Sequence, residues 1–469
     1  MGRLILGDVV LPSVQNESFS SLRQRTTPRK ERYAIGRGLR QQVSRQVLGQ
    51  WQPADDRIDP VELIKQSHRG RVPALIPVRV ARMLDSPYGF LRGSAIVMAA
   101  DLAGLPATGI MPVICGDAHL GNFGFYGSPE GDLVIDLNDF DEAHPGCWEW
   151  DLRRLVVSIW VAGRQNNATE DQCRDAVRSC VSAYRDEVRF LADEPLLARS
   201  YNRLDVQKLT DAANVDSLRD EIARASKRAR RRTSDRALPR FTHEHEGTRR
   251  IVEEPPLITR LPDQEYDAIA QGLDDYLATV PSQWRRILAG YTLIDIAHKV
   301  VGVGSVGLRA YIALLEGSSP SDVIFLQLKE ARRSVLAEYV HGRAAWHDHQ
   351  GQRVAEYQQA LQTVSDPLLG WTTVGKRQYY VRQFRNMKGS IGLDSIDVDA
   401  LTDYAGILGH LLAKGHARTS GASMIAGYVG SSDKLANALA RFAAAYADQT
   451  EADHARLQQA VHRGELPTD

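Results

Sequence analysis

The spacing of apolar residues predicts helices over much of the chain. Residues 94–102 are an apolar run that suits a buried helix, and residues 148–192 and about 350–364 have helical spacing. From about residue 398 to the end, Ala-rich segments again predict helices. In the 148–192 segment, one apolar face carries Leu152, Leu155, Val156 and Ile159.

Short and alternating apolar runs predict strands in two regions. Residues 110–115 and 132–137 are short apolar runs separated by a polar loop. Residues 299–385 contain several strand patterns separated by Gly, Pro and Ser turns, with the helix at 350–364 between them. We therefore expect residues 299–385 to form a mostly antiparallel sheet with one helix, which makes the protein α+β.

The apolar pattern weakens at the N-terminus and at two linkers. The first part of the chain is polar and predicts a loosely ordered arm with one helix near 36–50. A basic segment at 224–240 and a Pro-rich segment at 253–262 come before the strands. The expected parts are an N-terminal arm at 1–55, a helical core at 56–290, a β-rich part at 291–390 and C-terminal helices at 391–469.

Composition and charge narrow the class of protein. The chain has 58 Lys and Arg and 58 Asp and Glu, so its net charge is zero and indicates neither a nucleic-acid nor a membrane partner. The basic run 226–232 fits a solvated face better than an anion site. Four cysteines without a C-x-x-C pair, and no long apolar run or signal-peptide core, predict a cytoplasmic protein without a membrane span.

The polar loop between the first two strands carries residue types that phosphoryl transfer needs. The sequence CGDAHLGN contains Asp117 and Asn122, and Asp136 ends the next strand. Phosphoryl transfer needs a carboxylate that orients or deprotonates the attacking hydroxyl and oxygen ligands for Mg²⁺. These three residues could surround one phosphate, or they could be local turn and cap residues. Asp139 and Asp141 could add a second metal ligand, or they could be ordinary acidic turn residues.

The pattern G-D-x-H-x-x-N, followed by an apolar strand ending in Asp, resembles the catalytic core of aminoglycoside phosphotransferases and choline kinases. These enzymes are small-molecule branches of the protein-kinase-like superfamily. The resemblance implies that Asp117 is the catalytic base and that Asn122 and Asp136 bind the metal. The segment HPGCWEWDL is similar to a Gly-Asp-Pro…Asp-Leu element of that family, which implies that Asp151 braces the loop. Cys115 stands where the family usually has His.

Longer phrases resemble a narrower family. The segments SPYGFLRG, CGDAHLGNFG, DLNDFDEAHPGCWEWDLRRL, KVVGVGSVGLRAY, FLQLKEA and YVRQFRNMKGS together are similar to the DUF2252 family of bacterial proteins. This resemblance covers about residues 60–450. It implies membership of that family, but the family name carries no defined function.

The motif GVGSVG at 302–307 is a candidate phosphate-binding turn. A G-x-G-x-x-G motif can also open a dinucleotide-binding helix, but a helix must then begin directly after the last Gly. Here a strand and a turn are expected after Gly307, which favours a hairpin of the kind that covers ATP phosphates in kinases. The predicted nucleotide contacts from this motif are Gly302, Gly304, Ser305 and Gly307.

Lys329 ends an apolar strand, FLQLK, downstream of this motif. Protein kinases hold the α- and β-phosphates with such a lysine and pair it with a carboxylate on a helix. We expect Glu356 to be that carboxylate, with Glu338 as the second candidate. A strand-end lysine that reaches solvent, and exposed glutamates on a helix, are the alternatives.

Basic residues near two predicted element ends have secondary expected roles. Arg382, Arg385 and Lys388 follow a strand where a kinase has its interlobe hinge, and they could contact the nucleotide or an acidic substrate. His416 and Arg418 end a predicted helix that could pack under the polar loop, but the preferred interpretation is that these basic side chains interact favourably with the helix dipole.

The order of the motifs is unusual for a kinase, because the loop at 115–122 precedes the glycine motif. We therefore expect a two-lobed, protein-kinase-like fold that is circularly permuted, with a mainly helical catalytic lobe and a smaller antiparallel β lobe. The alternative is that the glycine motif is accidental.

These features predict an ATP- and Mg²⁺-dependent phosphotransferase that acts on a small-molecule acceptor. A kinase-fold enzyme that transfers AMP, and a non-catalytic nucleotide-binding regulator, are the alternatives. The sequence leaves the acceptor and the oligomeric state open.

Overall fold

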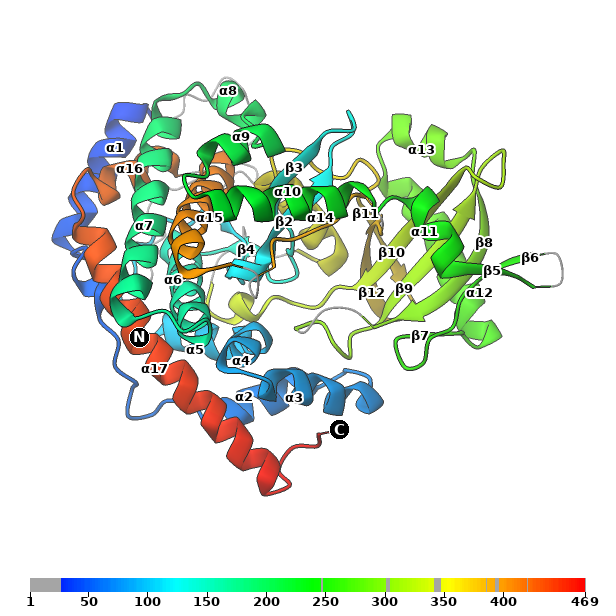
Figure 1. The fold of residues 1–469 in the computed structure, drawn as a ribbon, viewed down its shortest axis with the longest axis horizontal. Helices are drawn as coiled ribbons and strands as arrows, with labels where there is room; N and C mark the ends of the chain where they lie inside the picture. Colours follow the sequence, from blue (N-terminus) through cyan, green and yellow to red (C-terminus); the bar gives the residue numbers. More distant parts are fainter. Residues whose placement is uncertain are drawn as a thin grey trace.

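The computed structural model describes residues 27–245, 248–300, 304–340, 347–384, 386–392, 396–419 and 421–468. A helical part and a six-stranded antiparallel sheet lie beside each other and occupy opposite sides of the view in Figure 1. This arrangement confirms the expected α+β class.

Most helices belong to the helical part, which contains the largest hydrophobic core. Helix α6 is buried along nearly its whole length, and α7 and α17 pack against it. The helices of this part are α1 Arg29–Gly38, α2 Pro60–His68, α3 Ile76–Leu84, α4 Pro87–Gly93, α5 Ala95–Ala103, α6 Trp148–Gln165, α7 Glu170–Asp193, α8 Leu196–Tyr201, α9 Val206–Ala212, α10 Asp216–Arg230, α15 Val398–Thr419, α16 Ala422–Val429 and α17 Lys434–His462.

Two helix boundaries differ from the sequence-based expectation. The helical stretch at 148–192 is two helices, because the chain turns at Asn167, where φ is +61, and Thr169 caps α7 together with Gln172. The helix expected near 36–50 is wrong, because α1 ends at Gly38 and the segment after it contains only the short 3-10 helices Leu39–Gln41 and Val47–Gly49. The segment after α1 is anchored to α16, because Arg40 Nε donates to the carbonyl of Tyr428 at 2.8 Å.

The sheet has the strand order β11-β12-β10-β9-β8-β7, and neighbouring strands are antiparallel. The antiparallel sheet expected from residues 299–385 is confirmed, although β8 lies wholly before the glycine motif and β7 comes from the Pro-rich linker. The strands are β7 Ile258–Thr259, β8 Thr292–Lys299, β9 Ala310–Glu316, β10 Val323–Glu330, β11 Gly370–Val374 and β12 Arg377–Gln383.

Both faces of the sheet are covered, because side chains alternate along each strand. In β9, Tyr311 and Ala313 join one cluster with α12, whereas Ile312 and Leu314 join another cluster on the opposite face. The elements around the sheet are α11 Ser234–Phe241, the hairpin of β5 Thr242–His245 and β6 Thr248–Ile251, α12 Asp263–Tyr276, α13 Ser282–Leu288 and α14 Gln350–Leu361.

Two small antiparallel pairs are embedded in the helical part and frame the polar loop. Strand β1, Val113–Ile114, pairs with β4, His144–Pro145. Strand β2, Phe123–Gly127, pairs with β3, Leu133–Leu137. The sequence pattern predicted the strands at 110–115 and 132–137 but missed β2, which directly follows the polar loop.

The glycine motif lies in the connection between β8 and β9, as a hairpin turn requires. Residues 304–307, called the glycine turn below, are described, and no helix begins at Gly307. The N-terminal helices contact this turn, since Val72 N–H donates to the carbonyl of Gly307 at 2.8 Å. Arg71 Nη1 also donates to the carbonyl of Val306 at 2.6 Å. Within the described part of the chain, no helix is long and apolar enough to cross a membrane.

Arg57 joins α5 to α17 through a buried ion-pair cluster. Its Nη2 lies 2.8 Å from Asp101 Oδ2 and 2.6 Å from Asp453 Oδ2, and both carboxylates are buried. Tyr446 Oη also donates to Asp101 at 2.6 Å. Burial alone lowers the pKa of Arg57, but the two carboxylates raise it above its usual value. The arginine therefore stays charged and stabilises both buried carboxylates.

We expect Arg57→Ala to lower the free energy of unfolding by about 3–5 kcal/mol in urea denaturation, because two buried carboxylates lose their cation. Arg164→Ala is the matched control and should cost about 1 kcal/mol or less, because its partners are solvated. Equal losses for the two variants would contradict this view of the cluster. The partners of Arg164 are Glu170, Asp448 and Glu451.

Candidate active site

The polar loop, residues 115–122, is held by a buried carboxylate from the first turn of α6. Asp151 accepts the N–H groups of Cys115 at 2.7 Å and Gly116 at 2.8 Å, so its expected role as a brace is confirmed. His416 Nε2 lies 3.2 Å from the same carboxylate, and Tyr184 Oη lies 2.8 Å from His416 Nδ1. His416 therefore supports the loop, a role that the helix-dipole interpretation missed.

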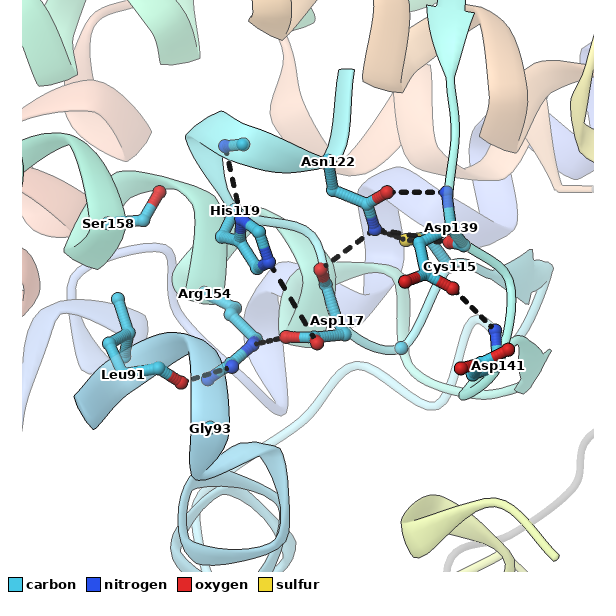
Figure 2. A network of polar contacts seen from close by, with 12 residues as sticks. Leu91, Gly93, Cys115, Asp117, His119, Asn122, Asp139, Asp141, Arg154 and Ser158 are labelled. Carbon is cyan, nitrogen blue, oxygen red and sulfur yellow. Dashed lines mark hydrogen bonds and ion pairs between the residues drawn. The ribbon is translucent and has the colours of Figure 1, made fainter. Parts of the chain in front are cut away.

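Asp117 lies at the surface of a cavity and forms an ion pair with Arg154, whose Nε donates to Oδ1 (Figure 2). Arg154 is itself buried, and its Nη2 donates to the carbonyl of Leu91 at 2.8 Å. Burial raises the pKa of Asp117 to about 7, against the lowering effect of Arg154. The second oxygen, Oδ2, is 4.0 Å from His119 Nε2. The carboxylate is thus fixed through Oδ1, and its other oxygen faces His119.

His119 is a neutral neighbour of Asp117. Burial lowers the pKa of His119 well below its usual value, and Arg92 and Arg154 lower it further. Its Nδ1 accepts the N–H of Gly121 at 3.1 Å, so the ring proton is on Nε2, which faces Asp117.

Asn122 connects the polar loop to the acidic loop, residues 138–143. Its Nδ2 donates to the carbonyls of Asp117 and Asp139, each at 3.1 Å, and its Oδ1 accepts the N–H of Asp139 at 2.6 Å (Figure 2). Nδ2 also contacts Cys115 Sγ at 3.1 Å, so Cys115 takes part in loop geometry where the resembling family has His. Asn122 therefore positions Asp139.

Lys329 of β10 reaches the acidic loop from the sheet. Its Nζ is 2.5 Å from Asp141 Oδ2 and 3.8 Å from Asp139 Oδ1. Ser305 Oγ of the glycine turn donates to Asp141 at 2.9 Å, and Tyr380 Oη does so at 3.1 Å. Lys329 meets a carboxylate, as predicted, but its expected partner Glu356 is wrong, because Glu356 hydrogen-bonds with His347 at 2.9 Å instead. The role of Lys329 at a metal or phosphate stays a prediction.

The charges of this pair stabilise each other. Burial raises the pKa of Asp141, but Lys329 and the hydrogen bond from Ser305 bring it below its usual value. Burial lowers the pKa of Lys329, but Asp139 and Asp141 raise it above its usual value. Both groups are therefore ionised at neutral pH.

Arg353 of α14 clamps the acidic loop, and sequence reasoning did not identify it. Its guanidinium donates to the carbonyls of Asp141 at 2.8 Å, Ala143 at 2.5 Å and Arg332 at 2.8 Å. The side chain is fully buried. The sequence signal for this role was a single arginine next to the apolar positions Val354 and Ala355, in a helix beside the site.

Asp136 is not brought to the cavity. Its Oδ1 accepts the N–H of Leu137 at 2.9 Å, and its Oδ2 accepts the N–H of Thr363 at 3.0 Å. Burial raises its pKa, and Lys414 is one of the groups that oppose this rise. Asp139, whose side chain is 51% exposed, lies at the cavity instead. Gly302 and Arg385 fall outside the described residues.

The cavity has a volume of about 640 Å³, within the usual range for small-molecule sites. The polar loop, the acidic loop, the glycine turn and the α3–α5 region all contribute to its wall. Glu338, the second candidate partner of Lys329, also reaches it. The charged residues in the wall are Arg71, Arg79, Arg92, Asp117, Asp139, Asp141, Glu142, Glu330, Arg332, Arg333 and Glu338.

Arg382 also approaches the acidic loop. Its Nη1 donates to the carbonyl of Asn138 at 3.4 Å, and its guanidinium lies 5.4 Å from the ring centre of Tyr380. Burial lowers the pKa of Lys388 well below its usual value, and Arg382 adds to that effect, so the positive form of Lys388 is disfavoured. Asp139 therefore has Arg382 as a second cation on the sheet side, besides Lys329.

The carboxylates of the acidic loop suit a magnesium ion whose remaining ligands are substrate phosphates and water. In the described residues, no group of three or more His, Cys, Asp or Glu side chains is arranged to hold a metal ion. Mg²⁺ is usually bound by one or two carboxylates together with substrate phosphates and water. Asp139 and Asp141 supply two such carboxylates on the same loop.

The comparisons with known proteins identify the family. Residues 71–460 match the family described as an uncharacterized protein conserved in bacteria, DUF2252, and the chain therefore belongs to this family. A search of curated proteins found no match, and a search of solved structures found none either.

We expect Asp151→Asn to destabilise the fold by about 1–3 kcal/mol, because an amide cannot accept both loop N–H groups and leaves one buried donor without a partner. Urea denaturation followed by far-ultraviolet circular dichroism measures the loss. Asp171→Asn, whose side chain is 80% exposed, is the control and should change stability little. Similar stability of both variants would mean that Asp151 does not brace the loop.

Proposed function

We propose that this member of the DUF2252 family is an ATP- and Mg²⁺-dependent phosphotransferase acting on a small-molecule acceptor. One observation carries the proposal. Asp117, Asp139 and Asp141 line one cavity beside a glycine turn, and Lys329, from a third segment, contacts Asp141 from behind the cavity wall. Phosphoryl transfer needs this combination of a base, metal-binding carboxylates, a phosphate-binding lysine and a glycine-rich turn.

We further infer a circularly permuted, protein-kinase-like fold. The turn between β8 and β9 carries the glycine motif, and Lys329 lies on β10, the third strand counted from that hairpin. Protein kinases also have the Gly-rich loop first and the lysine on the third strand. Here both elements follow the polar loop in the chain, which is the reversal of order that a permutation produces.

The roles of the residues follow from their contacts. Asp117 accepts the proton of the acceptor hydroxyl through the oxygen that Arg154 does not hold. Asp139 and Asp141 hold the metal, and Asn122 and Arg353 position the loop that carries them. Lys329 exchanges its contact with Asp141 for the nucleotide phosphates. When bound, Mg²⁺ neutralises charge on the transferring phosphate.

The glycine turn and the hinge complete the nucleotide site. Gly304 and Ser305 line the cavity beside the acidic loop, and Ser305 Oγ already donates to Asp141 at 2.9 Å. Arg382 adds positive charge beside Asp139, where the phosphates of the nucleotide require it. Asp136 has a structural role in this proposal.

ATP with Mg²⁺ is expected to raise the melting temperature, because a ligand that binds only the native state stabilises it, by about 2.7 kcal/mol at a hundredfold excess over Kd. Asp139→Ala should remove most of the Mg²⁺-dependent part of this rise. The control is Asp132→Ala, an exposed acidic residue that pairs with Arg203 outside the cavity. A rise in Asp139→Ala equal to that of the wild type would show that Asp139 does not hold the metal.

Asp117→Asn should leave Mg²⁺-ATP binding within a few fold and lower turnover by about 10²–10⁴, the range for a lost general base. With a metabolite pool as acceptor, label should transfer from γ-labelled ATP. Transfer of label only from α-labelled ATP would instead indicate AMP transfer. Wild-type turnover should rise with pH through about 7, where Asp117 ionises. The proposed base is ruled out if Asp117→Asn retains wild-type turnover.

A further inference from the structure

The cavity contains a second set of charges that the proposed reaction does not use. Four arginines lie together on its wall and are called the arginine cluster below. They come from the α2–α3 connection, α3, α4 and the segment after β10. The cluster consists of Arg71, Arg79, Arg92 and Arg332.

Arg79 is the most informative member because it is 2% exposed and only partly satisfied. Its Nη2 donates to the carbonyl of Gly93 at 2.6 Å, but Nε and Nη1 have no hydrogen-bond partner among the described residues. The Nε of Arg92 is also buried without a partner in this part of the chain. Leaving buried cationic donors unpaired is costly, so these groups are suited to receive an anion.

Two other members of the arginine cluster donate to a main-chain carbonyl. Arg71 Nε and Arg332 Nη1 both donate to the carbonyl of Ser67, at 2.9 and 3.3 Å. Within the described ranges, no carboxylate forms an ion pair with any member of the arginine cluster. Burial lowers the pKa of Arg79 well below its usual value, and the charges of Arg71 and Arg332 lower it further. Glu142, Asp141 and Glu330 act on Arg71 without forming an ion pair with it, whereas the charges that act on Arg79 among the described residues are those of other arginines.

The arginine cluster lies between the polar loop and the glycine turn. Arg92 is close enough to His119 for its charge to lower the pKa of that residue. On the other side, a Cβ atom on Gly304 would be 3.3 Å from the carbonyl of Arg92. Asp117 lines the same cavity, so an anion held by the arginines is adjacent to the proposed base.

We propose that the arginine cluster binds a phosphate group of the acceptor, so that the acceptor is a phosphorylated small molecule with a free hydroxyl. This inference rests on the proposed phosphotransferase activity. Guanidinium groups match the geometry of phosphate oxygens with paired N–H donors, and several arginines suit a dianion better than a single carboxylate. The nucleotide has its own cations at Lys329 and Arg382 on the sheet side.

The reaction is balanced as follows. The acceptor hydroxyl oxygen bonds to the γ-phosphorus of ATP, and the bond from that phosphorus to the bridging oxygen of ADP breaks. The hydroxyl proton passes to Asp117. The products are ADP and an acceptor that carries a second phosphate group.

Inorganic phosphate is the probe, and the full chain is titrated with it while the melting temperature is recorded. Phosphate should stabilise the wild type, and Arg79→Gln should bind it about tenfold to a hundredfold more weakly, the loss expected for a hydrogen bond to a charged group. Arg92→Gln serves as the second variant if Arg79→Gln does not fold. Arg174→Gln, with a 50% exposed side chain that pairs with Asp171 on α7 away from the cavity wall, is the matched control and should respond like the wild type.

A second titration in saturating Mg²⁺ and the non-hydrolysable ATP analogue AMP-PNP separates the acceptor from the nucleotide. Additive stabilisation by phosphate and AMP-PNP supports the proposal. Loss of the phosphate effect in the presence of AMP-PNP overturns it, because the arginines would then bind the nucleotide phosphates. An equal phosphate response of wild type and both variants also overturns it. Stabilisation by phosphate but not by AMP-PNP would leave an arginine-dependent anion site while the phosphotransferase proposal fails.

Discussion

The ion pair between Lys329 and Asp141 determines how the sheet meets the helical part at the cavity. Taking an ammonium and a carboxylate out of water costs several kcal/mol per ion, and only close contact with further hydrogen bonds offsets this cost. Ser305 and Tyr380 provide those bonds. Because one ion belongs to β10 and the other to the acidic loop, the pair fixes the loop relative to the sheet.

The remaining supports of the site are directed at the main chain. Asp151 accepts two N–H groups of the polar loop, Asn122 joins that loop to Asp139, and Arg353 holds three carbonyls around the acidic loop. These side chains fix where the backbone runs. The carboxylates of Asp117 and Asp139 are therefore held in place by their loops and still reach the cavity, which is the form of preorganisation that a binding or catalytic site needs.

The sequence predicted the elements of the site better than the directions of its side chains. The polar loop, the hairpin after β8 and the strand ending at Lys329 follow from local patterns of apolar and turn residues. Asp136 and Asp139 lie close together in the chain, and the pattern does not tell which of them faces the cavity. That choice depends on the pairing of β3 with β2 and on the N–H of Thr363, far along the chain. Local spacing also contained no information about Asp141 as the partner of Lys329.

Charged residues that come together only in the folded chain were the hardest to assign a role from the sequence. Each member of the arginine cluster looks like an ordinary surface arginine in the sequence, because the four residues are scattered over separate segments. The burial of Arg79 results from the packing of α3 and α4 beneath the glycine turn. The same holds for His416, whose position at a helix end suggested a dipole interaction, whereas its ring contacts Asp151.

The hydrogen bond between Val72 and Gly307 has a mechanical consequence. The Lys329–Asp141 pair already joins the sheet to the acidic loop, and this bond joins the glycine turn to the α2–α3 connection on another border of the cavity. Any movement that lifts the glycine turn away from the helical part must therefore first break the Val72 bond.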